Sequence, residues 1–203
     1  HLVAAACSVG CPRLVFTSSV SVYGMGNAPL GGFSEEEVNP DTLYGWSKLA
    51  GEEILQRTAE LTPGFSPISL RLSGVHGGDR TSGALYRFAS AAFDNVQIDV
   101  LEPKSLFQWA FIEDVLQGVE KALHFPMHDR HRVFNIASKD SFTLLQVAEK
   151  IIAITGSDSS ISTFDGALAR NVIMNVDRAL HELGYSSATL ETSLKNYFES
   201  RSR

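Results

Sequence analysis

Residues Arg13-Leu-Val-Phe-Thr17 and Ser66-Pro-Ile-Ser-Leu-Arg-Leu72 decide the fold. Both are short apolar runs, which are typical of strands buried on both faces of a sheet. Between them, residues 44–61 carry apolar side chains at helical spacing, and Pro63-Gly64 ends that pattern. A strand, a helix and a second strand in this order predict a right-handed βαβ unit in a parallel sheet. The helical spacing places Leu49, Ile54 and Leu55 toward the sheet and the polar residues among them, including Glu52, toward solvent.

The rest of the chain extends this α/β pattern in both directions. Residues 1–9 read as the last turns of a helix that Gly10 ends. Farther along, the spacing predicts helices over residues 83–93, 112–125, 144–155, 175–184 and 189–200, and strands within residues 96–109 and 133–137.

The composition excludes several classes of partner and site. The 203 residues carry 17 Lys and Arg against 23 Asp and Glu, a net charge of -6, with no dense basic block. Nucleic acid is therefore not an expected partner, because a phosphate track needs clustered cations. No apolar run approaches the roughly 20 residues of a membrane helix, so we expect no membrane partner. Two cysteines, Cys7 and Cys11, are too few for a disulfide framework and lack neighbouring ligands, which indicates a cytoplasmic protein without a metal site.

The strongest chemical signal is Tyr44-Gly-Trp-Ser-Lys48 at the start of the central helix. Positions four apart share a helix face, so the Lys48 ammonium lies near the Tyr44 phenol. A nearby cation favours the phenolate, the form that accepts a proton from an alcohol. The pair therefore predicts acid/base chemistry on a hydroxyl or carbonyl group.

Two polar loops strengthen this prediction. The segment Thr17-Ser-Ser-Val-Ser-Val-Tyr-Gly24 follows the first strand, and Arg71-Leu-Ser-Gly-Val-His-Gly-Gly78 spans the end of the second. Ligands of doubly wound sheets bind at the carboxyl ends of the strands. We expect both loops and the Tyr-Lys turn to meet in one crevice.

These segments resemble the extended short-chain dehydrogenase/reductase superfamily, in particular its NAD-dependent epimerase/dehydratase group. The Ser-Ser-x-x-Val-Tyr-Gly24 segment, the stretch from Pro40 to Glu52, the Arg71-Leu72 strand and Phe-Ile-Glu-Asp-Val115 occur in the group's order. The resemblance implies a Rossmann-type doubly wound parallel sheet, of which this chain holds the second half, with a small C-terminal substrate lobe. The resemblance assigns residues 1–78 to the second half of the Rossmann domain, with the catalytic Ser, Tyr and Lys. It assigns residues 79–203 to the substrate-binding lobe, within which the last Rossmann elements return at about residues 107–137.

The resemblance also implies roles for individual residues. Tyr44 would be the catalytic acid/base, Lys48 would poise it and hold the nicotinamide ribose, and Ser19 would hydrogen-bond the reacting oxygen. The cofactor, NAD or NADP, would lie against Thr17, Ser18, Tyr44, Lys48, Ser73 and Val75. The substrate, a sugar or sugar nucleotide, would meet Ser19, Ser21, His76 and Arg80. A homodimer is expected through the helix at 44–61.

Four positions depart from the family pattern. The acidic pair of the family's dehydratases is replaced by Val20 and Ser21, which argues against elimination of water. Gly74 stands where many sugar-nucleotide members carry Asn, and Phe107 where many carry an Arg that holds the diphosphate. Losing a charge-assisted contact to phosphate is costly, so these changes favour simple oxidoreduction over a nucleotide-linked substrate.

The family's glycine-rich turn between a first strand and its helix, which binds the cofactor pyrophosphate, has no counterpart in these residues. We therefore expect the first half of the sheet to be missing from this chain. The main interpretation is an NAD(P)-dependent oxidoreductase or epimerase acting on a sugar or sugar-like polyol. The alternatives are a nucleotide-sugar epimerase, and a catalytically silent dinucleotide-binding relative or truncated remnant.

Overall fold

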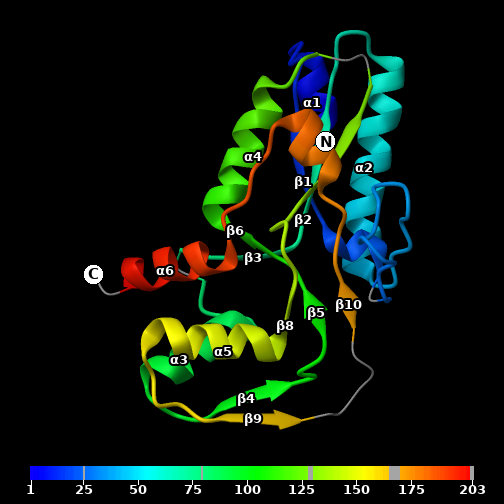
Figure 1. Cartoon of the computed structure of the whole chain (residues 1–203). Helices are drawn as coiled ribbons and strands as arrows, with labels where there is room; N and C mark the ends of the chain where they lie inside the picture. Colours follow the sequence, from blue (N-terminus) through cyan, green and yellow to red (C-terminus); the bar gives the residue numbers. More distant parts are fainter. Residues whose placement is uncertain (25, 79, 128–129, 165–169, 202–203) are drawn as a thin grey trace.

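The computed structural model describes residues 1–24, 26–78, 80–127, 130–164 and 170–201. In the upper part of Figure 1 a parallel sheet lies between helix α2 on one face and helix α4 on the other. The lower part is a lobe of helices above a pair of strands. Within the described ranges, no helix is long and apolar enough to cross a membrane.

The sheet part is Rossmann-like and confirms the predicted βαβ unit. Its elements are α1 (Leu2–Ser8), β1 (Val15–Ser19), η1 (Val20–Tyr23), α2 (Leu43–Leu61), β2 (Ile68–Leu72), α4 (Ile112–His124), β7 (Arg132–Ile136) and η2 (Ala179–Leu183). The strand order is β1-β2-β7, and both pairings are parallel, with Val15 opposite Ile68 and Ile68 opposite Arg132. Strand β1 therefore forms one edge of the described sheet.

Local signals fix the ends of helix α2. The Thr42 side chain accepts a hydrogen bond of 3.0 Å from the Gly45 amide, which caps the first turn. After Leu61 the chain turns through Gly64, whose φ of +81° lies in the left-handed region that favours glycine. On the inner face of the helix, Leu55 and Ala59 pack with Phe65 in a buried apolar cluster.

Two side chains of α2 do not lie on the side of the helix, buried or exposed, that the spacing predicts. Ile54 is 56 % exposed, although the spacing assigned it to the core, and Glu52 is 3 % exposed, although it was assigned to solvent. Glu52 is buried because Arg71 on strand β2 supplies a counter-charge beneath the helix. Both predictions were wrong, and for Glu52 the reason is that apolar spacing alone does not register a buried ion pair.

The lobe consists of two strands and three helices. Its elements are α3 (Ala84–Phe93), β4 (Ile98–Leu101), α5 (Leu144–Thr155), β9 (Ile161–Phe164) and α6 (Leu190–Arg201). Helix α5 begins with a capping box in which Thr143 and Gln146 bond each other's backbone amides, and it ends at Gly156. The helices of the lobe share one core with β4, built around Phe88, Ile151 and Leu194.

Short strands join the two parts. They are β3 (Gly74–His76), β5 (Leu106–Phe107), β6 (Trp109–Phe111), β8 (Phe142–Thr143) and β10 (Asn171–Val172). Strand β3 pairs with β6 in parallel, which places Gly74 opposite Trp109. The division of the chain at residue 78 stays a prediction.

Candidate active site

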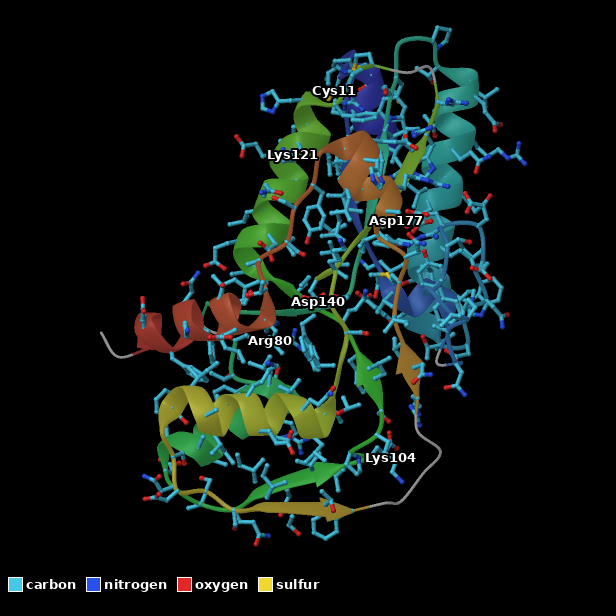
Figure 2. The ribbon with its side chains drawn as sticks, in the orientation of Figure 1. Cys11, Arg80, Lys104, Lys121, Asp140 and Asp177 are labelled. Atoms are coloured by element: carbon cyan, nitrogen blue, oxygen red, sulfur yellow. The ribbon has the colours of Figure 1, made fainter. Side chains whose placement is uncertain are left out.

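A cavity of about 380 Å³ opens where strands β1 and β2 end and helix α2 begins. It brings together every sequence-predicted site residue except His76: Thr17, Ser18, Ser19, Ser21, Tyr44, Lys48, Ser73, Val75 and Arg80. Arg80 belongs to the loop between β3 and α3, and Figure 2 labels it between the sheet part and the lobe. The predicted crevice at the carboxyl ends of the strands therefore exists.

Lys48 links helix α2 to strand β1. Its ammonium donates a hydrogen bond of 2.9 Å to the carbonyl oxygen of Thr17 and lies 5.6 Å from the centre of the Tyr44 ring. The Tyr44 side chain is accessible, with 55 % of the residue exposed. The pair thus has the arrangement that the i, i+4 spacing predicts: a fixed cation beside a phenol that a substrate can reach.

Two serines face this pair from the ends of the strands. The Ser19 hydroxyl accepts a hydrogen bond of 3.1 Å from the Ser21 amide and so caps the short helix η1. Ser73 is 8 % exposed, and its buried hydroxyl has no partner among the residues that the structure describes. Ser73 therefore lines the cavity, but its hydroxyl oxygen is itself closed off from the open space.

Beneath the cavity, a buried ion pair holds helix α2 to strands β1 and β2. The Arg71 guanidinium donates to both carboxylate oxygens of Glu52, from Nε at 3.0 Å and from Nη2 at 2.6 Å. The Ser18 hydroxyl donates to the same carboxylate. The Ser18 side chain is therefore engaged by the protein, and its predicted contact with the cofactor stays a prediction.

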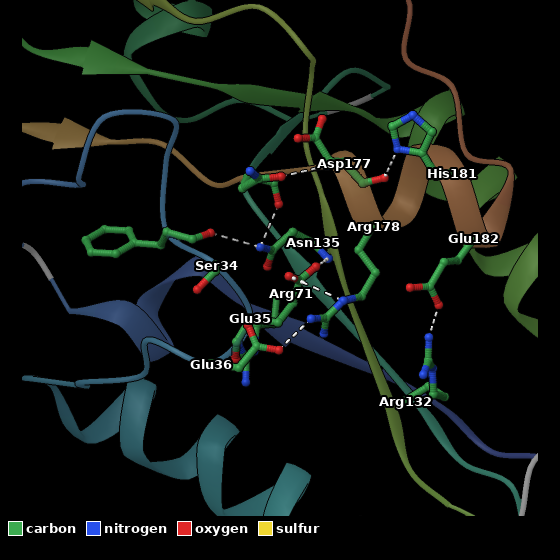
Figure 3. Close-up of polar contacts among 12 residues, drawn as sticks. Ser34, Glu35, Glu36, Arg71, Arg132, Asn135, Asp177, Arg178, His181 and Glu182 are labelled. Atoms are coloured by element: carbon green, nitrogen blue, oxygen red, sulfur yellow. Dashed lines mark hydrogen bonds and ion pairs between the residues drawn. The ribbon is translucent and has the colours of Figure 1, made fainter.

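The network continues across the sheet. Arg71 also donates to the Tyr23 hydroxyl at 2.9 Å, and that hydroxyl donates to the side-chain oxygen of Asn135 on β7 at 2.7 Å. Burial raises the pKa of Tyr23 to about 12, against the opposing effect of Arg71, so its phenol stays protonated as a donor. Figure 3 shows the outer members, where Arg178 pairs with Glu35 and Glu36.

Sequence reasoning missed this network as a unit. The available signal was a charged residue, Arg71, inside a strand predicted to be buried on both faces. A buried guanidinium requires a partner, and the carboxylate four residues after Lys48 lies on the helix face that covers this strand.

Gly45 allows the first turn of α2 to touch the loop that follows β1. A Cβ atom at Gly45 would overlap the carbonyl oxygen of Ser21 and lie 3.0 Å from Pro40 Cβ. Since the obstacle is backbone, it cannot rotate away. The absence of a side chain at this position therefore sets the distance between Tyr44 and the serine loop.

Gly45→Ala is expected to destabilise the protein by about 1–3 kcal/mol, the usual cost of overpacking. Gly51→Ala is the matched control on the same helix, because its Cβ would meet only the movable Phe16 ring, at 2.7 Å from Cζ. Alanine favours a helix over glycine by about 1 kcal/mol, which offsets the smaller clash. Urea unfolding of both variants tests this, and equal midpoints would contradict it.

His76, the one predicted site residue outside the cavity, lies in a neighbouring pocket. It is 7 % exposed and packs edge-on against Phe111, with ring centroids 5.1 Å apart. Burial lowers the pKa of His76 to about 4, with a smaller contribution in the same direction from the charge of Arg80 and an opposing one from a hydrogen bond with the Gly74 backbone.

This lowered pKa predicts a loss of stability in acid. Between pH 6.5 and about 4 the unfolded chain binds a proton at His76 that the folded chain does not. The free energy of unfolding therefore falls by about 1.4 kcal/mol per pH unit as the pH drops through this window, and the contribution is fully present above it. Urea unfolding at several pH values should show a smaller slope in His76→Phe than in the natural protein. An unchanged slope would contradict the assignment.

Comparison with known proteins identifies the family of the chain. Residues 1–137 match the NAD dependent epimerase/dehydratase family. The chain belongs to that family. Among curated members, UDP-glucuronate 4-epimerase 1 of Arabidopsis thaliana is 25% identical over 206 aligned positions, covering 92% of this chain and 48% of the plant protein. The chain spans about half the length of the curated family members it matches.

Solved structures of the family have the same fold. UDP-glucose 4-epimerase of Thermotoga maritima, solved with UDP-glucose, superposes with a TM-score of 0.85 at 22% identity, over 100% of this chain and 68% of that one. MoeE5, solved with UDP-glucuronic acid and NAD, gives a TM-score of 0.83 at 25% identity, over 100% and 69%. These likenesses confirm the predicted Rossmann-type fold, and the match over residues 1–137 confirms the predicted family.

Proposed function

We propose that the natural full-length protein is an NAD-dependent oxidoreductase or epimerase that acts on a hydroxyl group of a sugar or sugar-like polyol. The observation that carries the proposal is the single cavity in which Tyr44, Lys48 and Ser19 meet. These residues supply an acid/base, a fixed cation and a hydroxyl at one place, as proton transfer from an alcohol requires.

The cavity fits the nicotinamide end of NAD. Its volume of about 380 Å³ lies in the usual range of ligand pockets, about 300–1,000 Å³, and Lys48 supplies a cation to its lining. Lys48, Thr17, Ser73 and Val75 would hold the cofactor there. When bound, NAD supplies the acceptor for a hydride.

The chain's own residues provide the proton chemistry. Ser19 orients the substrate oxygen, and Tyr44 takes the hydroxyl proton as the carbinol carbon is oxidised. The Lys48 ammonium, fixed by the Thr17 carbonyl oxygen, stabilises the phenolate that precedes this transfer. An oxidoreductase releases the resulting ketone, whereas an epimerase retains it and reduces it on the other face.

A second candidate is epimerisation of a nucleotide sugar, which the activity in the names of the matched plant proteins favours. A direct test gives the natural full-length protein NAD with a panel of free sugars, polyols and UDP-sugars. Nicotinamide absorbance follows oxidation, and NMR of the products detects inversion. Failure to bind NAD or to change any hydroxyl-bearing substrate would favour a catalytically silent relative.

We also propose a homodimer through helix α2. Its outer face exposes Leu43, Trp46, Ile54 and Leu61, which follow one another at helical spacing. Ile54→Glu places a charge in this stripe and should shift the natural full-length protein toward the monomer in sedimentation, while an unchanged mass would contradict the interface.

A further inference from the structure

The reacting groups of the cavity come from two different elements. Tyr44 and Lys48 belong to helix α2, whereas Ser19 is the last residue of strand β1. Proton transfer requires all three within reach of one substrate oxygen, and a misplacement of about 1 Å can lower a rate about 10²-fold. The position of α2 along β1 is therefore part of the geometry of the reaction.

Two contacts, one helical turn apart on α2, join the helix to consecutive residues of β1. The Lys48 ammonium donates to the Thr17 carbonyl oxygen at 2.9 Å. The Glu52 carboxylate accepts a hydrogen bond from the Ser18 hydroxyl. Lys48 and Glu52 share a helix face because they are four residues apart. The helix is thus joined to the strand at two points, both next to Ser19.

The second contact is buried and includes strand β2 as well. Strand pairing places Ser18 directly opposite Arg71, so the two side chains point to the same face of the sheet. Glu52 lies over both, and it accepts from Arg71 Nε at 3.0 Å and from Nη2 at 2.6 Å. Each of the three residues is 3 % exposed, and exclusion of water strengthens hydrogen bonds between charged groups.

Stability alone does not account for charges at this place. Burying an ion pair costs desolvation, and an apolar pair of similar volume often holds two elements together as well. The charged pair adds direction, because the planar guanidinium fork and the carboxylate accept only a narrow range of relative placements. The Ser18 hydroxyl ties the same carboxylate to β1. These contacts specify where α2 lies on β1, in addition to holding it there.

We propose that Ser18, Glu52 and Arg71 form a positioning cluster, which sets the register of α2 on β1 and so places Tyr44 and Lys48 opposite Ser19. Ser18 acts in this cluster through the helix, and not by contact with substrate or cofactor. The inference rests on the proposed function, because it takes Tyr44 to be the acid/base.

Ser18→Ala tests the cluster, because it removes one hydroxyl and leaves the pair of Arg71 with Glu52 in place. The assay uses the natural full-length protein, NAD and whichever sugar, polyol or UDP-sugar of the panel above turns over fastest. We expect kcat to fall about 10–100-fold and each KM to rise less than about 3-fold, since misplaced groups lose the reaction and keep their binding contacts. A KM for NAD raised about 10-fold at natural kcat would assign Ser18 to the cofactor and overturn the proposal.

Ser69→Ala is the matched control. Ser69 is a buried serine of the neighbouring strand β2, and its hydroxyl hydrogen-bonds the His131 ring at 2.7 Å in place of a residue of α2. Both variants lose one buried hydrogen bond, so their unfolding midpoints should fall by similar amounts. Only Ser18→Ala should lower kcat, and equal kcat values in the two variants would overturn the proposal.

Hydrogen exchange reads the cluster without turnover. The amides of residues 43–50 should exchange about 5-fold faster in Ser18→Ala than in Ser69→Ala, because the start of α2 opens more readily when one of its two contacts with β1 is weakened. Equal exchange over this segment would contradict the positioning role.

The double variant Arg71→Met/Glu52→Gln separates positioning from folding. It leaves no buried charge without a partner, so the protein should fold. Its kcat should still be at least about 10-fold below the natural value, because the directional pair is gone. A folded double variant with natural kcat would overturn the proposal.

Tyr44→Phe distinguishes failure of the cluster from failure of the function it serves. If Tyr44→Phe kept natural turnover, the proposed chemistry would fail, and faster exchange in Ser18→Ala would then report a structural contact only. If Tyr44→Phe lost turnover while Ser18→Ala matched Ser69→Ala, the chemistry would stand and the positioning role would be wrong.

Discussion

Tyr44→Phe in the natural full-length protein is expected to lower kcat by about 10²–10⁴-fold, the usual contribution of a positioned acid/base. The change removes only the phenolic oxygen. The ring that faces Lys48 is kept, and because the residue is 55 % exposed, its hydroxyl contributes little to folding. We therefore expect unchanged unfolding midpoints alongside the loss of turnover.

Ser47→Ala is the matched control for this variant. Ser47 belongs to the same helical turn, and its hydroxyl donates a hydrogen bond of 2.7 Å to the Tyr44 carbonyl oxygen. It should keep the natural kcat. A Tyr44→Phe enzyme with near-natural turnover would exclude Tyr44 as the acid/base and with it the mechanism derived from the cavity.

Arg71→Met is expected to cost about 3–5 kcal/mol of stability, the effect of leaving a buried charge without its partner. Among the described residues, Glu52 would keep the Ser18 hydroxyl as its only donor, and Tyr23 would lose its hydrogen bond from Arg71. Urea unfolding measures the loss. The double variant Arg71→Met/Glu52→Gln removes both charges and should recover a large part of it.

An exposed ion pair on the same helix provides the comparison. Arg57 and Glu60 lie 2.9 Å apart at the surface, where such pairs contribute at most about 1 kcal/mol. Arg57→Met should therefore change the unfolding midpoint only slightly. If Arg71→Met cost no more than Arg57→Met, the buried network would not be what holds the catalytic helix to the sheet.

Much of the fold was predictable because its signals are local. Apolar runs at residues 13–17 and 66–72 became β1 and β2, and the cap at Thr143 with Gln146 began α5 as the pattern indicated. The closing helix predicted over 175–184 is shorter, with η2 at Ala179–Leu183. Helix ends depend on tertiary contacts that spacing does not report.

The cavity was predictable for a different reason: topology brings the carboxyl ends of neighbouring parallel strands together, whatever their side chains. What could not be predicted was which polar residues turn inward. In the sequence, Glu52 cannot be told from a solvated helix carboxylate, because its partner Arg71 lies on a strand 19 residues later. His76 lies in a separate pocket, on strand β3, which pairs with β6. Both arrangements depend on residues that are distant in the sequence, so no local pattern predicts them.

The register of the parallel sheet has a kinetic consequence. Val15 meets Ile68, and Ile68 meets Arg132, so each pairing must close a long loop before any of its hydrogen bonds form. Chains dominated by such distant pairings refold slowly, in milliseconds to seconds, and expose unpaired strands meanwhile. During synthesis, β1 must wait for β2, and β2 for β7, so these strands stay unpaired and open to aggregation until β7 has been made.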